Sequence, residues 1–495
     1  MRILCVASEM VPLAKTGGLG DVTGALPPAL ARAGARVVTY LPCYRTAMSG
    51  VESPRTVLSG LKVPLGDAEI RVNLLEGWAD RGTPVYLVER EDLFDRPNLY
   101  GAGGEDYYDN LERFTVFCHA VLMGAAALDQ RPDIVHCHDW QTGLIPALLK
   151  GPYAGLPGRA AVVFTIHNLG YQGLFPLQKF PLTGLDPGEF LHPEGLEFWG
   201  NISLLKSGIL YADAVTTVSP TYAREIRTRE YGMGMEGVLN KRARSLHGIL
   251  NGGDYERWNP ANDPHLPARY DLENSAGKSL CKESLLAEMG LSRSLRERPL
   301  LGVVSRLDTQ KGLDLVLEAL PGIMEMDVGL ALLGSGDRAV EDNLREMQAR
   351  YAGKMAVKLG FDDALAHRIM AGADILGVPS RYEPCGLTQI YALKYGTVPL
   401  VRATGGLEDT IQDYEPATGR GNGFKFKEAA PGALLEALQR AVDLYGEPPG
   451  WERIRRAGME ADYSWDRSAG KYIEIFEHVT ANLKKLSTTR EEPLR

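Results

Sequence analysis

The sequence has few cysteines, no long apolar run and no excess of positive charge, and each shortage excludes a class of protein. Six cysteines are scattered over 495 residues, most of them within apolar stretches, which is typical of reduced, buried thiols and not of a disulfide framework. No apolar run approaches the roughly 20 residues that span a bilayer. The net charge of −9 argues against nucleic acid or an anionic membrane as a general partner.

The first ten residues, MRILCVASEM, also lack the features of a signal peptide. They hold one arginine and a short apolar stretch, which indicates a buried β-strand that begins at residue 2 or 3. We therefore expect a cytoplasmic protein whose folded structure starts at once. The composition, 44% hydrophobic and 24% charged, is that of a globular chain, and the length suggests two or three domains.

Short runs of β-branched and apolar residues alternate with helical patterns along most of the chain. Such alternation predicts an α/β fold, with doubly wound parallel sheets covered by helices on both faces. Two of the helical patterns are VTGALPPALARAG (22–34) and GLTQIYALKYG (386–396). The expected strands are RILCVAS (2–8), RVVTYLP (36–42), PVYLVE (84–89), DIVHCH (133–138), AVVFTIH (161–167), AVTTVS (214–219), LLGVVSR (300–306), VGLALLGS (328–335), MAVKLG (355–360), ADILGVPS (373–380) and TVPLVRA (397–403).

A stretch rich in Gly, Pro, Asn and polar residues interrupts this alternation from NGGDYERWNP (251–260) onward. A domain boundary in this stretch predicts a first domain over 1–250 and a second over 251–465. The last segment, 466–495, carries the amphipathic helical pattern SAGKYIEIFEHVTANLKKL, which we expect to pack back on the first domain. Its polar end, STTREEPLR, is expected to fray.

Ligands of open α/β sheets gather at the carboxyl ends of strands, where loops lead into helix N-termini. The first such loop is KTGGLGD (15–21), between the first strand and a helix expected from near Val22. Its glycines let the backbone approach an anion closely, and Lys15 adds a positive charge. A plain structural turn is the alternative. The spacing is G-G-x-G and not the dinucleotide fingerprint G-x-G-x-x-G.

The second loop, SRLDTQKG (305–312), places Arg306 at a strand end and Lys311 before a helical pattern. Two cations in these positions could hold both sides of a pyrophosphate. The alternative is a pair of solvated surface cations.

The third loop, PSRYEPCGL (379–387), places Glu383 before Pro384, which fixes the turn, and Gly386, which is expected to open a helix. A carboxylate beside such a helix start could grip sugar hydroxyls while backbone amides hold phosphate. The alternative is that Glu383 only caps the helix. ATGGLED (403–409) repeats the Thr-Gly-Gly-Leu of the first loop, and we expect it to support the Glu383 loop.

Two further stretches could be functional sites but are each open to a purely structural interpretation. The run His136-Cys137-His138-Asp139 resembles a metal cluster, but on a strand Cys137 points away from both histidines, so the three cannot converge. The chain also contains no Asp-x-Asp, with which metal-dependent transferases hold a nucleotide diphosphate, so we expect no metal and no other cofactor. The aromatic-rich YGAGGEDYYDN (100–110) could stack on sugar rings or be a surface loop.

Several of these motifs together resemble the bacterial glycogen synthases, in the same order and over nearly the whole chain. They are KTGGL, HDWQTG (138–143), TIHNLGYQG (165–173), SRLDTQKG and PSRYEPCGLTQIYALKYGTVPLVRATGGLEDT (379–410). The resemblance implies a GT-B type glycosyltransferase, with two Rossmann-like domains and a cleft between them. It also implies retaining transfer of glucose from ADP-glucose to the non-reducing end of an α-1,4-glucan, such as glycogen or a maltooligosaccharide, with release of ADP.

The resemblance also implies roles for the matching residues. Lys15, with Gly17, Gly18 and Asp21, would face the donor pyrophosphate and sugar, while Arg306 and Lys311 would neutralise the departing ADP. Glu383 would contact the donor glucose, His167 would lie against the reacting face of the sugar, and Asp139 would contact sugar or acceptor. The other substrate-binding residues that it implies are Asn168, Cys385, Gly386, Leu387 and Thr388. Tyr391 stands where many related retaining transferases have a second glutamate, so we expect rearranged ribose contacts.

Rival functions remain open on the same two-domain plan. A glycan phosphorylase would turn over inorganic phosphate in place of a nucleotide sugar, and a nucleotide-sugar epimerase is a related alternative. A nicotinamide dehydrogenase is disfavoured because the fingerprint does not follow the first strand. A glucan-binding scaffold would release no ADP, and the retention of Lys15, Arg306, Lys311 and Glu383 argues against it.

Overall fold

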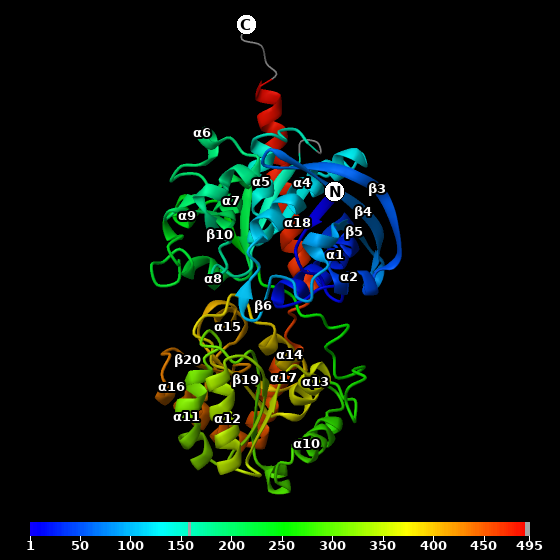
Figure 1. Ribbon diagram of the computed structural model, residues 1–495. Coiled ribbons are helices and arrows are strands. Elements are labelled where there is room, and N and C mark those ends of the chain that lie inside the picture. Colours follow the sequence, from blue (N-terminus) through cyan, green and yellow to red (C-terminus); the bar gives the residue numbers. More distant parts are fainter. Residues whose placement is uncertain (157–159, 491–495) are drawn as a thin grey trace. The chain divides into compact units, whose positions relative to one another are not determined.

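The computed structural model describes residues 1–156 and 160–490, and for residues 486–490 the backbone alone. The chain divides into two compact units (Figure 1). Unit 1 contains residues 1–218 and 223–252 and the chain from Trp465 onward, and unit 2 contains residues 219–222 and 253–464. The chain therefore leaves unit 1 after Gly252 and returns to it at Trp465. No helix within the described ranges is long and apolar enough to cross a membrane.

Unit 1 is built on a nine-stranded sheet in the order β14-β13-β9-β8-β1-β2-β5-β4-β3. The strands from β14 to β5 in this order are parallel, and most of their residues are buried, because helices cover both faces. This accounts for the continuous apolar runs by which the longer ones could be predicted. The parallel strands are β1 (Arg2–Val6), β2 (Arg36–Pro42), β5 (Thr83–Glu89), β8 (Ile134–His138), β9 (Ala161–Ile166), β13 (Ala214–Thr217) and β14 (Leu246–Gly248), of which the short β14 was not predicted.

A long antiparallel hairpin at one edge of this sheet was not predicted. It consists of β3 (Glu52–Leu65) and β4 (Ala68–Ala79), joined by Gly66 at φ 59° and Asp67. The residues of β3 are mostly exposed or half-buried, so no apolar run marks the strand. The available signal was the Gly-Asp pair between two segments of alternating polarity, which is typical of a two-residue hairpin turn. The short strands β6 (Gly101–Ala102), β7 (Glu105–Asp106), β10 (Leu174–Pro176), β11 (Glu197–Phe198) and β12 (Asn201–Ser203) form two further small sheets.

The C-terminal helix α18 (Trp465–Arg490) belongs to the core of unit 1 (Figure 1, red). Its apolar face packs with residues of α1 (Gly18–Arg32) and of β1 in one buried cluster. Tyr472 and Phe476 of α18 are fully buried there, beside Ile3 and Val22. The predicted amphipathic helix thus exists, but it continues through STTR (487–490), part of the end that was expected to fray. The rest of that end lies outside the described residues.

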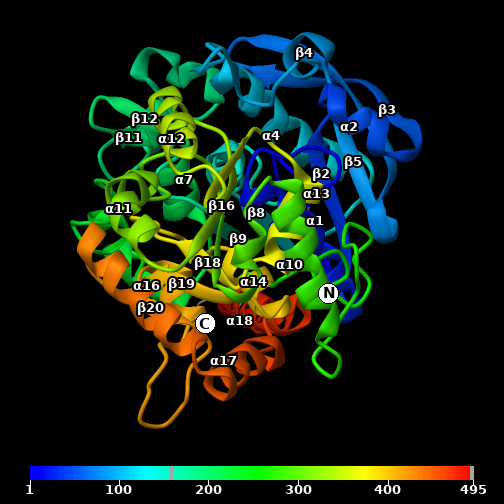
Figure 2. The same cartoon turned by 90° about the horizontal axis from the view of Figure 1, so that it is seen from below.

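Unit 2 has a six-stranded, wholly parallel sheet in the order β17-β16-β15-β18-β19-β20. Figure 2 shows α11, α12 and α16 on one side of it and α10 and α13 on the other. The strands are β15 (Leu300–Val304), β16 (Gly329–Gly334), β17 (Met355–Leu359), β18 (Ile375–Val378), β19 (Val398–Arg402) and β20 (Phe424–Phe426). The helices are α10 (Ala276–Glu288), α11 (Leu313–Glu325), α12 (Arg338–Arg350), α13 (Asp363–Gly372), α14 (Thr388–Lys394), α15 (Gly405–Thr410), α16 (Pro431–Tyr445) and α17 (Pro448–Glu460).

Both sheets reverse their strand order beside their first strand. In unit 2 the order is 3-2-1-4-5-6 counted along the chain, and the parallel strands of unit 1 follow the same progression from β1. The reversal falls between β1 and β8 in unit 1 and between β15 and β18 in unit 2, and ligands of such sheets bind at the carboxyl ends of these strands.

The remaining helices are α2 (Arg45–Gly50), α3 (Glu91–Phe94), α4 (Asn110–Ala127), α5 (Leu144–Lys150), α6 (Pro187–Phe190), α7 (Leu204–Tyr211), α8 (Pro220–Glu225) and α9 (Glu236–Lys241).

Candidate active site

The loop after β1 carries Lys15 and the first glycine pair at the reversal point of unit 1. Helix α1 begins at Gly18 and not near Val22, so the glycine-rich stretch forms the first turn of the helix. Lys15 Nζ lies 2.7 Å from Asp21 Oδ1 in that turn. A Cβ added at Gly17 or Gly18 would meet no atom within 4 Å. This face of the turn is therefore open, beside the backbone amides that a helix start leaves without intrahelical partners.

A buried carboxylate, Glu9, fixes this loop and was missed in the sequence. It accepts hydrogen bonds from the Thr16 hydroxyl at 2.6 Å and from the backbone N–H groups of Thr16 at 2.7 Å and Gly17 at 3.1 Å. The amide of Gly17 is thus directed at Glu9 and not at an outside anion, in contrast to the prediction. An acid directly after a buried strand was the only signal, and it fits many roles.

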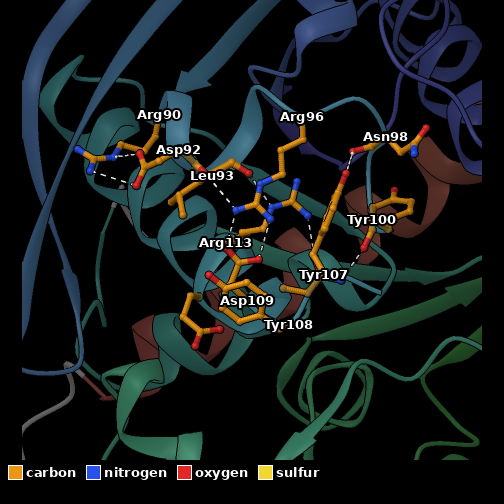
Figure 3. Close-up of polar contacts among 12 residues, drawn as sticks. Arg90, Asp92, Leu93, Arg96, Asn98, Tyr100, Tyr107, Tyr108, Asp109 and Arg113 are labelled. Carbon is orange, nitrogen blue, oxygen red and sulfur yellow. Dashed lines mark hydrogen bonds and ion pairs between the residues drawn. The ribbon is translucent and has the colours of Figure 1, made fainter. Parts of the chain in front are cut away.

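Tyr100, from the aromatic-rich stretch, also binds Glu9. Its hydroxyl donates to Glu9 Oε1 at 2.8 Å and lies 2.7 Å from Ser8 Oγ, and burial together with Glu9 raises its pKa well above the usual value. Its carbonyl accepts from the Tyr107 N–H at 2.9 Å (Figure 3). It also accepts from the Asn110 side chain at 2.9 Å. Tyr100 therefore supports the 15–21 loop indirectly, through its contact with Glu9. Tyr108 is 87% exposed, which fits the surface-loop alternative.

Asp139 and His167 lie together after β8 and β9. Asp139 adopts a left-handed φ of 56°, which is uncommon for a residue with a side chain, and its Oδ1 accepts from the His167 N–H at 2.7 Å. Burial raises the pKa of Asp139 to about 8, despite the backbone donors at His167 and Asn168. Burial lowers the pKa of His167 to about 3. Near neutral pH the pair is therefore a largely protonated acid beside an uncharged imidazole.

The histidines of the run 136–139 are engaged with neighbouring side chains. His138 Nδ1 lies 2.9 Å from His167 Nε2, and His136 Nε2 lies 2.7 Å from the Thr165 hydroxyl. Both histidines are buried and take part in these side-chain hydrogen bonds.

The buried histidines of unit 1 predict an acid-sensitive fold. Burial lowers the pKa of His119 to about 4, of His136 and His167 to about 3, and of His138 well below 6.5. Between about pH 6.5 and pH 4 the unfolded chain binds protons there that the folded chain does not, so the free energy of unfolding falls by about 1.4 kcal/mol per pH unit for each protonated histidine. The raised pKa of Asp139 has the opposite effect, because the folded chain binds this proton from about pH 8 downward and the free energy of unfolding therefore rises as the pH falls.

Urea unfolding at pH 7.0 and at pH 5.5 measures this difference. We expect a loss of several kcal/mol at the lower pH, and a smaller loss in His119→Gln, which has one buried histidine fewer. An equal free energy of unfolding at both pH values would contradict the assignment of neutral, buried histidines.

In unit 2 the loops after β15 and β18 bring two predicted residues together. Lys311 Nζ lies 2.6 Å from Glu383 Oε2, and the Ser380 hydroxyl donates to the same oxygen at 2.8 Å. Glu383 is 5% exposed, so its carboxylate is buried, and its Oε2 is held by both of these contacts. Arg306 is half exposed and forms its own ion pair, with Asp308 at 3.0 Å.

The second glycine pair clamps the Glu383 loop. The Gly406 N–H donates to the Glu383 carbonyl at 3.1 Å. Gly405 has φ 47°, and a Cβ there would lie 1.8 Å from the same carbonyl oxygen, while a Cβ at Gly406 would lie 2.1 Å from the Cys385 carbonyl oxygen. The predicted supporting position is confirmed. The two Thr-Gly-Gly-Leu stretches thus differ, since the first is open and the second is packed against backbone.

The start of α14 differs from the prediction. The helix begins at Thr388 with Leu387 in the N-cap position, so Gly386, at φ 71°, precedes it by two residues and does not open it. Gln389 Nε2 donates to the carbonyls of Cys385 at 3.1 Å and Gly386 at 2.9 Å, which holds this turn. Tyr391 is buried and stacks on Trp258, with ring centroids 4.5 Å apart.

One G-x-G-x-x-G does occur in the chain, as GMGMEG at 232–237. It follows α8 and runs into the first residues of α9, and no strand precedes it directly, so it lacks the strand–turn–helix context of a dinucleotide fingerprint.

Comparison with known proteins gives one consistent family. A starch synthase catalytic domain matches residues 2–241, and a glycosyl transferases group 1 domain matches residues 292–457. The glycogen synthase of Koribacter versatilis is 45% identical over 479 residues, which are 96% of this chain and 98% of that protein. That of Anaeromyxobacter dehalogenans is 48% identical over 480 residues, 96% of this chain and 99% of that protein.

Two solved structures agree with this. The catalytic domain of starch synthase IV from Arabidopsis thaliana, bound to ADP and acarbose, superposes with a TM-score of 0.90 at 34% identity and covers 97% of this chain and 99% of that one. A sucrose-phosphate synthase from Thermosynechococcus elongatus, at 18% identity and a TM-score of 0.60 over 97% of this chain and 99% of that one, shares the fold alone.

Proposed function

The chain belongs to the glycogen and starch synthase family of GT-B glycosyltransferases, and on that premise we propose that it transfers glucose from ADP-glucose to the non-reducing end of an α-1,4-glucan, releasing ADP. The observation that carries the proposal is the Lys311–Glu383 pair at the carboxyl ends of β15 and β18. It puts a cation and a carboxylate at the reversal point where this fold binds ligands. The curated relatives are named glycogen synthase, and the starch synthase structure holds ADP and acarbose.

The charges of these residues suit cleavage of a sugar–phosphate bond. As the bond breaks, negative charge grows on the departing phosphate and positive charge grows on the sugar. We assign Arg306 and Lys311 of unit 2 to the phosphate, because preorganised cations in a water-poor site stabilise such charge by several kcal/mol. When the diphosphate binds, Lys311 can turn part of its hydrogen bonding from Glu383 to phosphate oxygens.

The remaining roles concern the sugars. We assign Glu383 to the hydroxyls of the donor glucose, with the turn at Cys385 and Gly386 beside it. Asp139, largely protonated near neutral pH, can donate as well as accept a hydrogen bond from a sugar, and the neutral His167 lies against it. Retention of configuration then follows from attack of the acceptor on the face that ADP leaves, with the leaving phosphate taking the acceptor proton.

Labelled ADP-glucose and labelled UDP-glucose, each offered with glycogen, test this function. We expect label in the polymer and equimolar ADP from the first donor, and slower incorporation from the second. Glucose 1-phosphate formed from glycogen and inorganic phosphate would indicate a phosphorylase instead. Glycogen binding without release of ADP would indicate a scaffold.

Metal-free transfer is a further part of the proposal. Because lysine and arginine side chains are assigned to the diphosphate, initial rates in excess EDTA should remain within a factor of two of those without it. Loss of activity that added Mg²⁺ or Mn²⁺ restores would show that a cation completes the site.

A further inference from the structure

Unit 2 contains a cluster of metal-binding side chains apart from the residues assigned to transfer. One potential ligand atom each of His265, Asp363 and His367 lies within 4.8 Å of the others. Asp363 and His367 are four residues apart on α13 and therefore share one face of that helix. His265 comes from the irregular segment that leads into α10. The cluster thus joins two elements that are distant in sequence.

His367 is held as metal-bound histidines are. Its Nδ1 lies 2.7 Å from Asp263 Oδ2, and both side chains are almost completely buried, at 1% and 0% exposure. A carboxylate at this distance holds the ring proton on Nδ1, so that the lone pair is on Nε2. The ring is also stacked on Trp258, with centroids 3.6 Å apart. The tautomer and the plane of the ring are therefore both set by neighbouring side chains.

The Nε2 of His367 is the unexplained atom of this region. It is buried and has no hydrogen-bond partner among the described residues. A buried polar atom left without a partner costs about 1–3 kcal/mol, and a bound cation would remove that cost. Asp263 organises the second histidine as well, because its Oδ1 accepts from the His265 backbone N–H at 2.8 Å.

We propose that His265, Asp363 and His367 bind one divalent transition-metal ion of the zinc type, with water completing its shell. Two imidazoles and one carboxylate suit Zn²⁺, whereas Mg²⁺ and Ca²⁺ prefer shells of oxygen. His265 is exposed and gives the ion a route from solvent. Asp363 also pairs with Arg257 at 2.5 Å, so the ion shares this carboxylate with a cation, which weakens binding.

The ion would cross-link the segment that enters unit 2 to α13. Any ligand that binds the folded chain and not the unfolded one raises the free energy of unfolding as its concentration exceeds the Kd. The expected function is therefore stabilisation of unit 2 without a part in glucosyl transfer, which is compatible with transfer in the presence of EDTA.

Zn²⁺ titration of the untagged, chelator-treated full chain tests the proposal. We expect one Zn²⁺ bound per chain by calorimetry, a Tm that rises with Zn²⁺ concentration, and no response to Mg²⁺. Co²⁺ should give the visible absorption of a site with nitrogen and oxygen ligands.

Three variants make the test specific. His265→Gln, an exposed change that leaves the buried His367 and Asp263 pair intact, should weaken Zn²⁺ binding at least tenfold and abolish the Tm rise. Arg257→Gln should tighten binding severalfold, because it removes the competing cation from Asp363. His192→Gln, a histidine of unit 1 outside the cluster, should change nothing. Absence of Zn²⁺ binding, or binding that His265→Gln leaves unchanged, would overturn the proposal.

Discussion

Replacement of Glu383 by glutamine should lower kcat by about a thousandfold, in line with the loss of one preorganised polar group at a reaction centre. Glutamine keeps the shape of the side chain and removes its negative charge. The donor glucose loses its anionic acceptor, and Lys311, 2.6 Å away, loses its partner. Steady-state rates at saturating ADP-glucose and glycogen, with the Tm of the same sample, measure the effect.

A second Lys–Glu pair of unit 2 gives the matched control. Glu408 binds Lys425 at 2.8 Å and is more exposed than Glu383. Glu408→Gln removes a more exposed ion pair, neither member of which is assigned to transfer, so kcat should stay within a factor of two. Breaking a buried pair costs stability too, so the Tm must show that Glu383→Gln is folded at the assay temperature. A folded Glu383→Gln with kcat within tenfold of the parent would remove Glu383 from the catalytic residues.

Gly405→Ala should destabilise unit 2 by about 3 kcal/mol or more, because two costs add. The alanine Cβ would lie 1.8 Å from the Glu383 carbonyl oxygen, so the backbone must move, and such overpacking costs about 1–3 kcal/mol. The positive φ of 47° adds about 1 kcal/mol for a residue with a side chain. Since the atom displaced belongs to Glu383, kcat should fall as well.

Gly17→Ala is the matched comparison, within the same Thr-Gly-Gly-Leu sequence. Gly17 has an extended φ of −157°, and its Cβ would meet no atom within 4 Å. Its free energy of unfolding should change by less than about 1 kcal/mol. Urea unfolding of both variants measures the contrast. Equal losses of stability would show that the two glycine pairs are not packed differently.

The longer parallel strands could be predicted because helices cover both faces of both sheets, whereas the three-residue strands β14 and β20 were not predicted. Burial on both faces makes each strand a continuous apolar run, as in RILCVAS and VGLALLGS, and such runs are visible without knowledge of the neighbours. The edge hairpin β3–β4 is not covered in this way, and its mixed residues hid it. The start of α1 at Gly18 could not be predicted either, since glycine has low helix propensity and favours a turn locally.

The candidate site was predicted in its parts and not in its arrangement. Lys311 and Glu383 could each be placed on a loop after a strand. Their contact depends on β15 lying beside β18, which is a property of strand order and not of either motif. Glu9 shows the converse limit: it belongs to no motif, and its importance comes from backbone donors that only the folded loop supplies.

The return of α18 to the core of unit 1 has a consequence for synthesis on the ribosome. Ile3 and Val22 share a buried cluster with Tyr472 and Phe476. The packing of β1 and α1 is therefore complete only after α18 has been synthesised. Unit 2, made almost wholly of residues 253–464, has all but four of its residues in one continuous stretch. A nascent chain halted before Trp465 would therefore display an unfilled apolar groove on unit 1, and truncations there should be recognised by chaperones or degraded.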